Sequence, residues 1–88
     1  AYDYVQELST IKPEPNSIIL DAGCGSGVVS RYLAQEYPNS HVIGCDANEK
    51  RIQTATKHSS SIKNLEFKTE ELTKLSYSSN FFDLIVCR

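Results

Sequence analysis

Residues 17–27 read SIILDAGCGSG, and this stretch decides the fold class. Its first five residues form a short apolar run between turn residues, which is typical of a strand buried on both faces of a parallel sheet. Residues 22–27 then place glycines at alternate positions, so that the backbone can turn tightly and a ligand can approach it where no Cβ intervenes. Residues 28–37 follow as a predicted helix, whose apolar side chains at helical spacing are Val28, Val29, Tyr32, Leu33 and Tyr37.

The rest of the chain continues this alternation of strand and helix. The predicted elements are a short amphipathic helix at 2–11, strands at 41–45, 64–68 and 81–87, and a helix at 49–58 with Ile52, Ala55 and Thr56 facing inward. Strands that alternate with helices imply parallel strands joined by right-handed crossovers, so the predicted fold class is α/β. We expect one domain, with a helix and a proline-containing linker at 1–16 and a core at 17–88.

Length, charge and cysteine content narrow the class of protein further. The chain has 88 residues, which is at most one domain. A net charge of −2 and a pI near 5.6 argue against a broad basic footprint for nucleic acid. Three cysteines without paired spacing predict neither a disulfide framework nor a metal site, so a reduced, cytoplasmic setting is expected. No segment approaches the roughly 18 apolar residues of a membrane span.

Two acidic positions follow predicted strands and are candidates for ligand binding. Asp46 ends the second strand of the core, where a carboxylate can accept both hydroxyl groups of an adenosine ribose. The alternative is that Asp46 caps the next helix, but Asn48 can serve as that cap, and the preceding glycine turn favours the ligand. Glu70 and Glu71 follow the third strand, where a carboxylate could accept a hydrogen bond from an adenine amino group. Taken alone, such a pair is more often a solvated surface.

Several motifs in series carry a resemblance to a known family. LDAGCGSG at 20–27 resembles motif I of the class I, Rossmann-like S-adenosylmethionine-dependent methyltransferases. CDANEKRIQTA at 45–55 resembles their second motif, and the segment from 65 to 88 resembles the third and fourth. The resemblance therefore covers nearly the whole chain, from about residue 17 to its last residue, and is strongest in the order of the motifs.

The resemblance implies a particular sheet and a particular reaction. The expected fold is a Rossmann-like three-layer sandwich with parallel strands in the order 3-2-1-4, an incomplete part of the family's seven-stranded sheet. The cofactor crevice would lie at the carboxyl ends of strands one and four. The expected activity is binding of S-adenosyl-L-methionine and transfer of its methyl group to an acceptor, with S-adenosyl-L-homocysteine as the product. Neither the acceptor nor a catalytic base can be identified from these residues.

The resemblance also assigns roles to individual residues. Asp21 would position the loop and the methionine amino group, and Asp46 would grip the ribose hydroxyl groups, with Ala47 packing on the adenine. The backbone of the glycine turn would line the methionine, and the residues after strand three would contact the adenine edge. The implied cofactor-binding residues are Asp21, Gly23, Cys24, Gly25, Asp46, Ala47, Glu71, Leu72 and Arg88.

Two alternative functions remain open. A nicotinamide-binding Rossmann domain carries G-x-G-x-x-G, whereas Gly27 here follows Gly25 by two positions and Val28 stands where that motif has its third glycine. A module that binds S-adenosylmethionine without catalysing a reaction would conserve the same loop. Cys24 precedes a helix and could be a reactive thiol, although a small packing residue is favoured. The apolar strand at 81–87 predicts self-association through its edge, or a chain that continues past Arg88.

Overall fold

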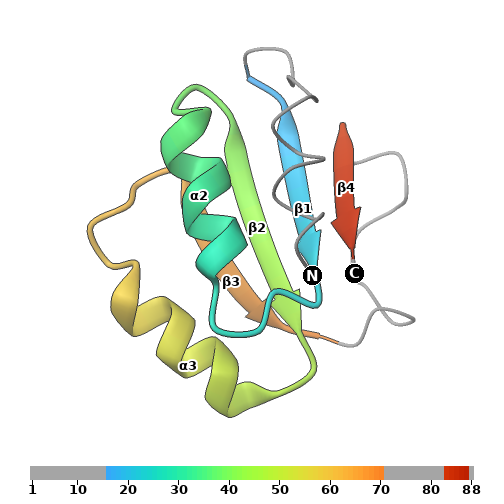
Figure 1. The fold of residues 1–88 in the computed structure, drawn as a ribbon, viewed down its shortest axis with the longest axis vertical. Helices are drawn as coiled ribbons and strands as arrows, with labels where there is room; N and C mark the ends of the chain where they lie inside the picture. The colour runs from blue at the N-terminus through green and yellow to red at the C-terminus, as the bar shows by residue number, and fades with distance from the viewer. Residues whose placement is uncertain (1–15, 71–82, 88) are drawn as a thin grey trace.

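The computed structural model describes residues 16–70 and 83–87 (Figure 1). Four parts of the prediction lie outside the described residues: the helix at 2–11, the linker up to residue 15, the start of the strand at 81–87, and Arg88. The elements follow the chain in the order β1 (Ile18–Ala22), α2 (Val28–Glu36), β2 (His41–Asp46), α3 (Glu49–His58), β3 (Leu65–Thr69) and β4 (Leu84–Cys87).

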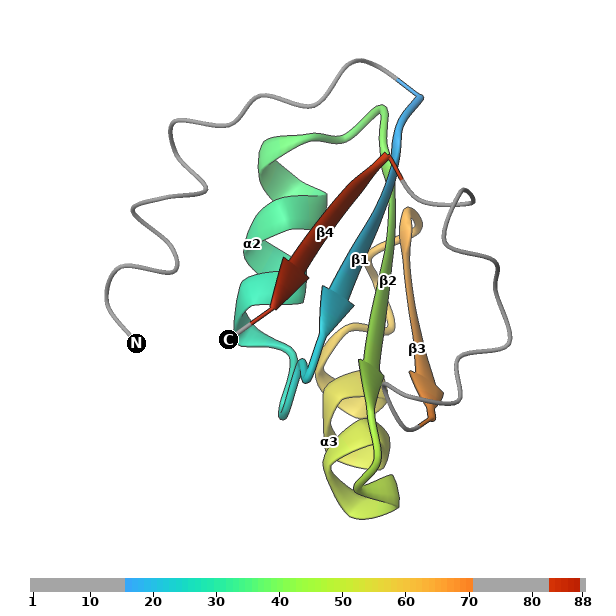
Figure 2. The ribbon, with the colours of Figure 1, turned by 90° about the vertical axis from the view of Figure 1, so that its right-hand side faces the viewer.

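The four strands form one parallel sheet in the order β3-β2-β1-β4, which confirms the predicted order. Because all strands run the same way, their carboxyl ends meet at one edge of the sheet (Figure 2). At this edge Ala22 lies opposite Cys45 of β2 on one side and Cys87 of β4 on the other. The chain leaves β1 toward β2 and later returns to β1's other side, so the strand order reverses at β1. In open α/β sheets ligands bind outside the carboxyl ends of the strands at such a switch point.

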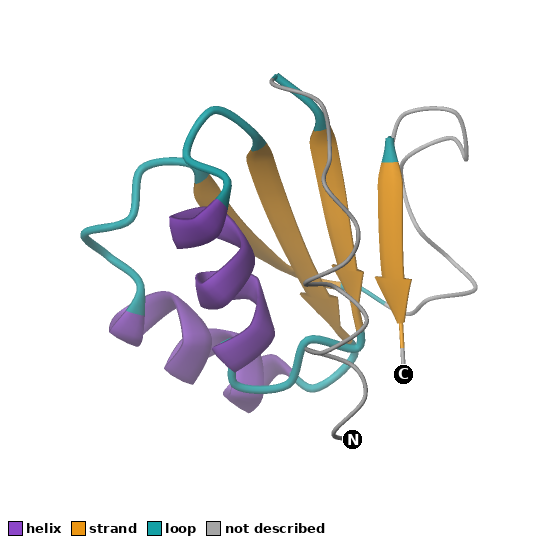
Figure 3. Ribbon diagram, turned by 45° about the horizontal axis from the view of Figure 1, so that its top comes forward, coloured by secondary structure: helices purple, strands orange, loops and turns teal. Residues whose placement is uncertain are grey.

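Both described helices cover the same face of the sheet (Figure 3). Right-handed crossovers that step in one direction, from β1 to β2 and from β2 to β3, place their helices on one face. The described residues therefore contain two of the three expected layers, namely the sheet and one layer of helices.

The core has one part on each face of the sheet, which explains the continuous apolar run in β1. Ile19 is fully buried on the helical side, where it joins Val29 and Leu33 of α2. Leu20, its neighbour, is buried on the opposite side with Ile43 of β2. A strand buried on both faces has no polar alternation, as the sequence indicated.

Some inward positions were predicted wrongly. Val28 is 64% exposed, because the buried face of α2 is centred on Val29, Ser30, Leu33 and Ala34. Small side chains on that face let the helix lie close to the sheet. In α3, Ile52 and Ala55 are buried as predicted, but Thr56 is exposed.

Two strands are shifted by one residue from the prediction, while β2 ends one residue later, at Asp46, and β4 begins only after Asp83. β1 covers 18–22 rather than 17–21, and β3 covers 65–69 rather than 64–68. Asn64 lies just before β3, and its side-chain amide group donates to the carbonyl oxygens of Ala34, Tyr37 and Ser40 at 2.9, 3.3 and 2.9 Å. Asn64 thereby satisfies carbonyl groups at the end of α2 and beyond that have no partner within the helix.

Candidate cofactor site

The glycine turn forms a loop at the carboxyl end of β1. Gly23 and Gly27 have φ values of +75° and +88°, in the left-handed region that other residues rarely adopt. Gly27 is also the N-cap of α2, where no side chain caps the helix. The alternating glycines are therefore needed by the backbone conformation of this loop.

Three hydrogen bonds attach the loop to the end of β2. The backbone N–H groups of Gly23 and Cys24 both donate to the carbonyl oxygen of Cys45, at 2.8 and 2.9 Å. The N–H of Gly25 donates to Oδ2 of Asp46 at 2.9 Å. The loop and Asp46 are thus held as one unit, although the loop follows β1 and Asp46 ends β2.

Asp46 does not cap α3. Its Oδ1 accepts the backbone N–H of Asn48 at 2.8 Å, while the Asn48 side chain accepts the N–H groups of Lys50 and Arg51 at 3.0 and 3.2 Å. Asn48 is therefore the N-cap, as the sequence allowed. The Asp46 side chain is half-buried, and a carboxylate has about four acceptor sites, so it can accept further hydrogen bonds from a ligand.

Asp21 lies beneath the loop rather than at its surface. The residue is 1% exposed, and its Oδ2 accepts a 2.6 Å hydrogen bond from the buried hydroxyl group of Ser30 in the first turn of α2. The bond links the end of β1 to the start of the helix across the loop. Sequence reasoning missed Ser30, whose only signal was a small polar residue within the buried stripe of the helix.

Burial makes the thiol groups near the loop unreactive. Burial, with the charges of Asp21 and Asp46, raises the pKa of Cys24 from 9.0 to about 12. The pKa of Cys45 rises from 9.0 to about 11, again chiefly through burial. Both thiols are free and stay protonated near neutral pH, so Cys24 is a packing residue, as favoured from the sequence. Within residues 16–70 and 83–87, no cluster of three potential metal ligands occurs.

An opening beside Gly23 suits a ligand that lies against the backbone. A Cβ placed on Gly23 would have no atom of the described residues within 4 Å, apart from its chain neighbours. The exposed Ala47 follows Asp46 at the same edge of the sheet. The structure thus brings Asp21, Gly23, Cys24, Gly25, Asp46 and Ala47 to one edge, whereas Glu71, Leu72 and Arg88 lie outside the described residues.

Comparison with known proteins identifies the family. The family described as "Methyltransferase domain" matches residues 13–88. An uncharacterized protein of Rickettsia prowazekii is 36% identical over 87 residues, which cover 94% of this chain and 35% of that protein. Phosphoethanolamine N-methyltransferase 3 of Arabidopsis thaliana is 34% identical over 76 residues, which cover 85% of this chain and 15% of that enzyme. The chain belongs to the methyltransferase domain family, and it spans about a third or less of the length of these relatives.

Solved structures agree with this assignment. PKMT2 from Rickettsia typhi, in complex with AdoHcy, has a TM-score of 0.74 and 34% identity over 89% of this chain and 16% of its own. A SAM-dependent methyltransferase from Aquifex aeolicus has a TM-score of 0.83 at 24% identity, over 97% of this chain and 47% of its own, and so shows the fold. The family match and the Gly25-to-Gly27 spacing both disfavour the nicotinamide-binding alternative.

Within residues 16–70 and 83–87, the helices are too short and too polar for any of them to span a bilayer.

Proposed function

We propose that this chain binds S-adenosylmethionine at the glycine loop and Asp46, and that the protein transfers the methyl group to an acceptor. One observation carries the proposal: the hydrogen bond from Gly25 to Asp46 joins the loop and the acid into a single surface beside the open space at Gly23. Relatives that are named methyltransferases, and a similar structure with bound AdoHcy, support the choice of ligand.

Each residue of the site would hold a different part of the cofactor. The backbone at Gly23, Cys24 and Gly25 would line the methionine portion, where the absence of Cβ atoms lets the ligand approach. The carboxylate of Asp46 would accept the ribose hydroxyl groups while it keeps the N–H of Gly25, and Ala47 would pack against the adenine. Asp21 would act from below by keeping α2 and the loop in register through Ser30. The contacts of Glu71 and Leu72 with the adenine edge, and the role of Arg88 in cofactor binding, remain predictions.

The protein contributes position rather than covalent chemistry. When bound, S-adenosylmethionine supplies a methyl group that is already electrophilic, because the sulfur that carries it is positively charged. A loop fixed by three hydrogen bonds can hold a ligand in one orientation, and a nucleophile aligned with its methyl group gains from proximity. A catalytic base stays unassigned.

The methyl acceptor is left open by this part of the protein. Relatives of similar identity carry different names, among them phosphoethanolamine N-methyltransferase, malonyl-[acyl-carrier protein] O-methyltransferase and ubiquinone biosynthesis O-methyltransferase. Since these proteins share this segment, we infer that it serves the methyl donor and that acceptor choice depends on residues elsewhere.

Two further proposals concern the location of the protein in the cell and its oligomeric state. A cytoplasmic location is supported by Cys24 and Cys45, which are free thiols. Self-association through β4 is supported by the sheet order, in which β4 is an outer strand whose partner among the described strands is β1. Light scattering after gel filtration tests the second proposal: a dimer that Ile85→Lys dissociates supports it, and a monomer at all concentrations refutes it.

Calorimetric titration of the full-length protein with S-adenosylhomocysteine, and separately with NAD⁺, tests the proposed ligand. We expect binding of the former only. Asp46→Asn keeps the shape of the side chain but replaces one acceptor by a donor, so it should weaken binding by about 10- to 100-fold, the range for one lost charged hydrogen bond. The matched control is Glu49→Gln, which removes the same charge from an exposed position three residues away and should leave affinity unchanged.

The possible outcomes of this titration separate the proposal from its alternatives. Binding of NAD⁺ in place of S-adenosylhomocysteine would contradict the proposed cofactor. Equal loss of affinity in both variants would show a general effect of charge and would contradict the role of Asp46. Binding of S-adenosylmethionine without its conversion by any tested acceptor would favour the non-catalytic module.

A further inference from the structure

The aromatic ring of Phe67 on β3 lies against the cofactor loop and the strand below it. A Cβ placed on Gly27 would lie 2.8 Å from Cζ of Phe67 and 3.0 Å from Cε1. A Cβ placed on Gly44 of β2 would lie 2.7 Å from both Cδ1 and Cε1. One edge of the ring therefore fits closely against two glycine positions, which lie on different elements.

Both glycine positions adjoin the parts of the site that hold the cofactor loop. Gly27 is the last residue of the loop, and its N–H donates to the carbonyl oxygen of Cys24 at 3.0 Å. Gly44 pairs with Asp21 in the sheet, and a Cβ there would lie 2.8 Å from the Ser30 hydroxyl oxygen that bonds to Asp21. A side chain larger than glycine at either position would displace the Phe67 ring.

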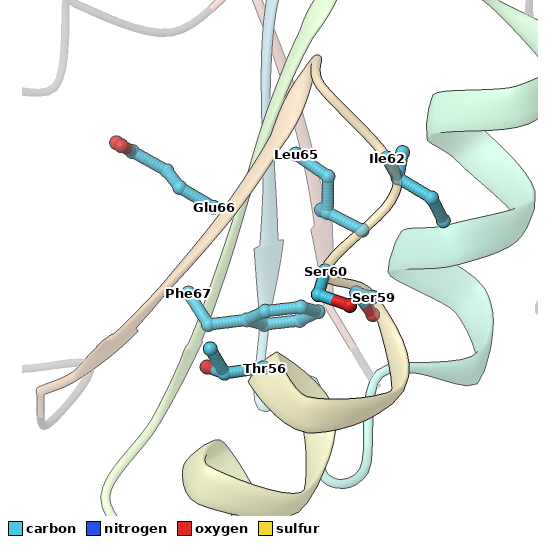
Figure 4. A pocket seen from close by; sticks show the side chains of 7 residues that line it. All are labelled: Thr56, Ser59, Ser60, Ile62, Leu65, Glu66 and Phe67. Carbon is cyan, nitrogen blue, oxygen red and sulfur yellow. The ribbon is translucent and has the colours of Figure 1, made fainter.

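The Phe67 ring has space on another side. A hollow of about 300 Å³ lies between the end of α3 and β3, and none of the residues that line it belongs to the cofactor loop (Figure 4). Figure 4 shows the ring of Phe67 extending from β3 toward Ser59 and Ser60, whereas the Glu66 side chain points to the other side of the strand. The residues that line the hollow with Phe67 are Thr56, Ser59, Ser60, Ile62, Leu65 and Glu66. A ring pushed away from the glycines can therefore move into the hollow, and the loop then loses its support.

We propose that Phe67 is a positioning residue for the cofactor: its ring supports Gly27 from beneath and so keeps the loop in the conformation in which Gly25 meets Asp46. Phe67 acts through the loop and needs no contact with the ligand. This inference rests on the proposed binding of S-adenosylmethionine at the loop. The inference adds a residue of β3 to those on which cofactor binding depends, and this residue does not face the ligand.

Two variants change the contact between the ring and the glycines, one by removing the ring and the other by displacing it. Phe67→Leu leaves a void against Gly27, and Gly44→Ala drives the ring toward the hollow. Each should raise the dissociation constant for S-adenosylhomocysteine by about tenfold, within the range known for residues that act on a site indirectly. The double variant should bind more tightly than the sum of the two effects predicts, because the added methyl group fills part of the space that the ring vacates.

The matched control is Leu65→Ala, two residues earlier on the same strand and also beside the hollow. It should lower the melting temperature but leave the dissociation constant unchanged. A second readout needs no ligand: the amide NMR signals of Gly25 and Gly27 should shift in Phe67→Leu and Gly44→Ala and stay in place in Leu65→Ala.

The two readouts distinguish this inference from the proposed function. Shifted loop signals in a protein that does not bind S-adenosylhomocysteine would support the positioning role and contradict the proposed ligand. Loop signals and affinity that are unchanged in Phe67→Leu, or changed equally in Leu65→Ala, would overturn the positioning role while the ligand assignment stands.

Discussion

Replacing Gly23 and Gly27 by alanine, one at a time, puts the same methyl group into two different surroundings within one loop. Both residues have positive φ, so backbone strain should lower the free energy of unfolding of either alanine variant by about 1–2 kcal/mol. At Gly23 the methyl group meets no atom within 4 Å in the part of the chain that the structure describes, so no further loss of stability is expected. At Gly27 it lies 2.8 Å from the Phe67 ring and 3.1 Å from Cβ of Ala55. Overpacking of this kind costs about 1–3 kcal/mol more.

Ligand binding should separate the two positions in another way. The space beside Gly23 is where the methionine portion of the cofactor would approach, so Gly23→Ala should weaken binding of S-adenosylhomocysteine by about tenfold or more, a loss of at least 1.4 kcal/mol. Gly23→Ala should thus reduce the affinity for S-adenosylhomocysteine strongly while it reduces the stability of the protein only modestly. Gly27→Ala should be the less stable variant by urea denaturation.

Urea denaturation and calorimetric titration of both variants in the full-length protein provide the assay. If Gly23→Ala destabilises the protein as much as Gly27→Ala, the space beside Gly23 is not open. If Gly23→Ala binds S-adenosylhomocysteine as the natural protein does, the loop does not face the cofactor. Either result would refute the reasoning.

Three further predictions concern Asn64 at the end of α2, Ser30 beside Asp21, and the thiol of Cys24. Asn64→Ala removes the donors to three carbonyl groups and should cost about 1–3 kcal/mol in urea denaturation; Asn64→Asp, which keeps the shape without the donors, should be no more stable. Ser30→Ala leaves the buried Asp21 short of a hydrogen bond and should cost a similar amount, about 1–3 kcal/mol, whereas a neutral effect would contradict the role assigned to Ser30. The pKa of Cys24 is raised from 9.0 to about 12, so its contribution to stability is present below pH 9 and is lost as the pH rises toward 12. Native-state alkylation of Cys24 near pH 8 should be about a thousandfold slower than that of an ordinary thiol, and rapid labelling would contradict its burial.

Much of the fold could be predicted because local patterns and the sheet agree. The apolar run in β1 indicated burial on both faces, and Ile19 and Leu20 are indeed buried on opposite sides. The boundary of β3 was misplaced by one residue because the start of its pairing with β2 depends on a strand more than 20 positions away, which a local pattern does not contain. Val28 was misassigned for a related reason: the stripe of α2 that faces the sheet includes Ser30, and a hydropathy pattern favours the larger valine.

The site was only partly predictable, because some of its contacts join residues that are far apart in the sequence. Motif order located the glycine loop and assigned Asp46 to the ligand, which left Asn48 to cap the helix, as it does. Contacts among Ser30, Gly44 and Phe67 are set by the packing of three elements, and each of these residues looks ordinary within its own element.

The most direct test of the proposed binding site is an amide NMR titration of the full-length protein with S-adenosylhomocysteine. We expect the largest shifts at Gly23, Cys24, Gly25, Asp46 and Ala47, with little change at Ser59 and Ser60 beside the hollow. Shifts confined to the hollow, or a loop that responds to NAD⁺ and not to S-adenosylhomocysteine, would contradict the assignment of the loop and Asp46 as the site for the methyl donor.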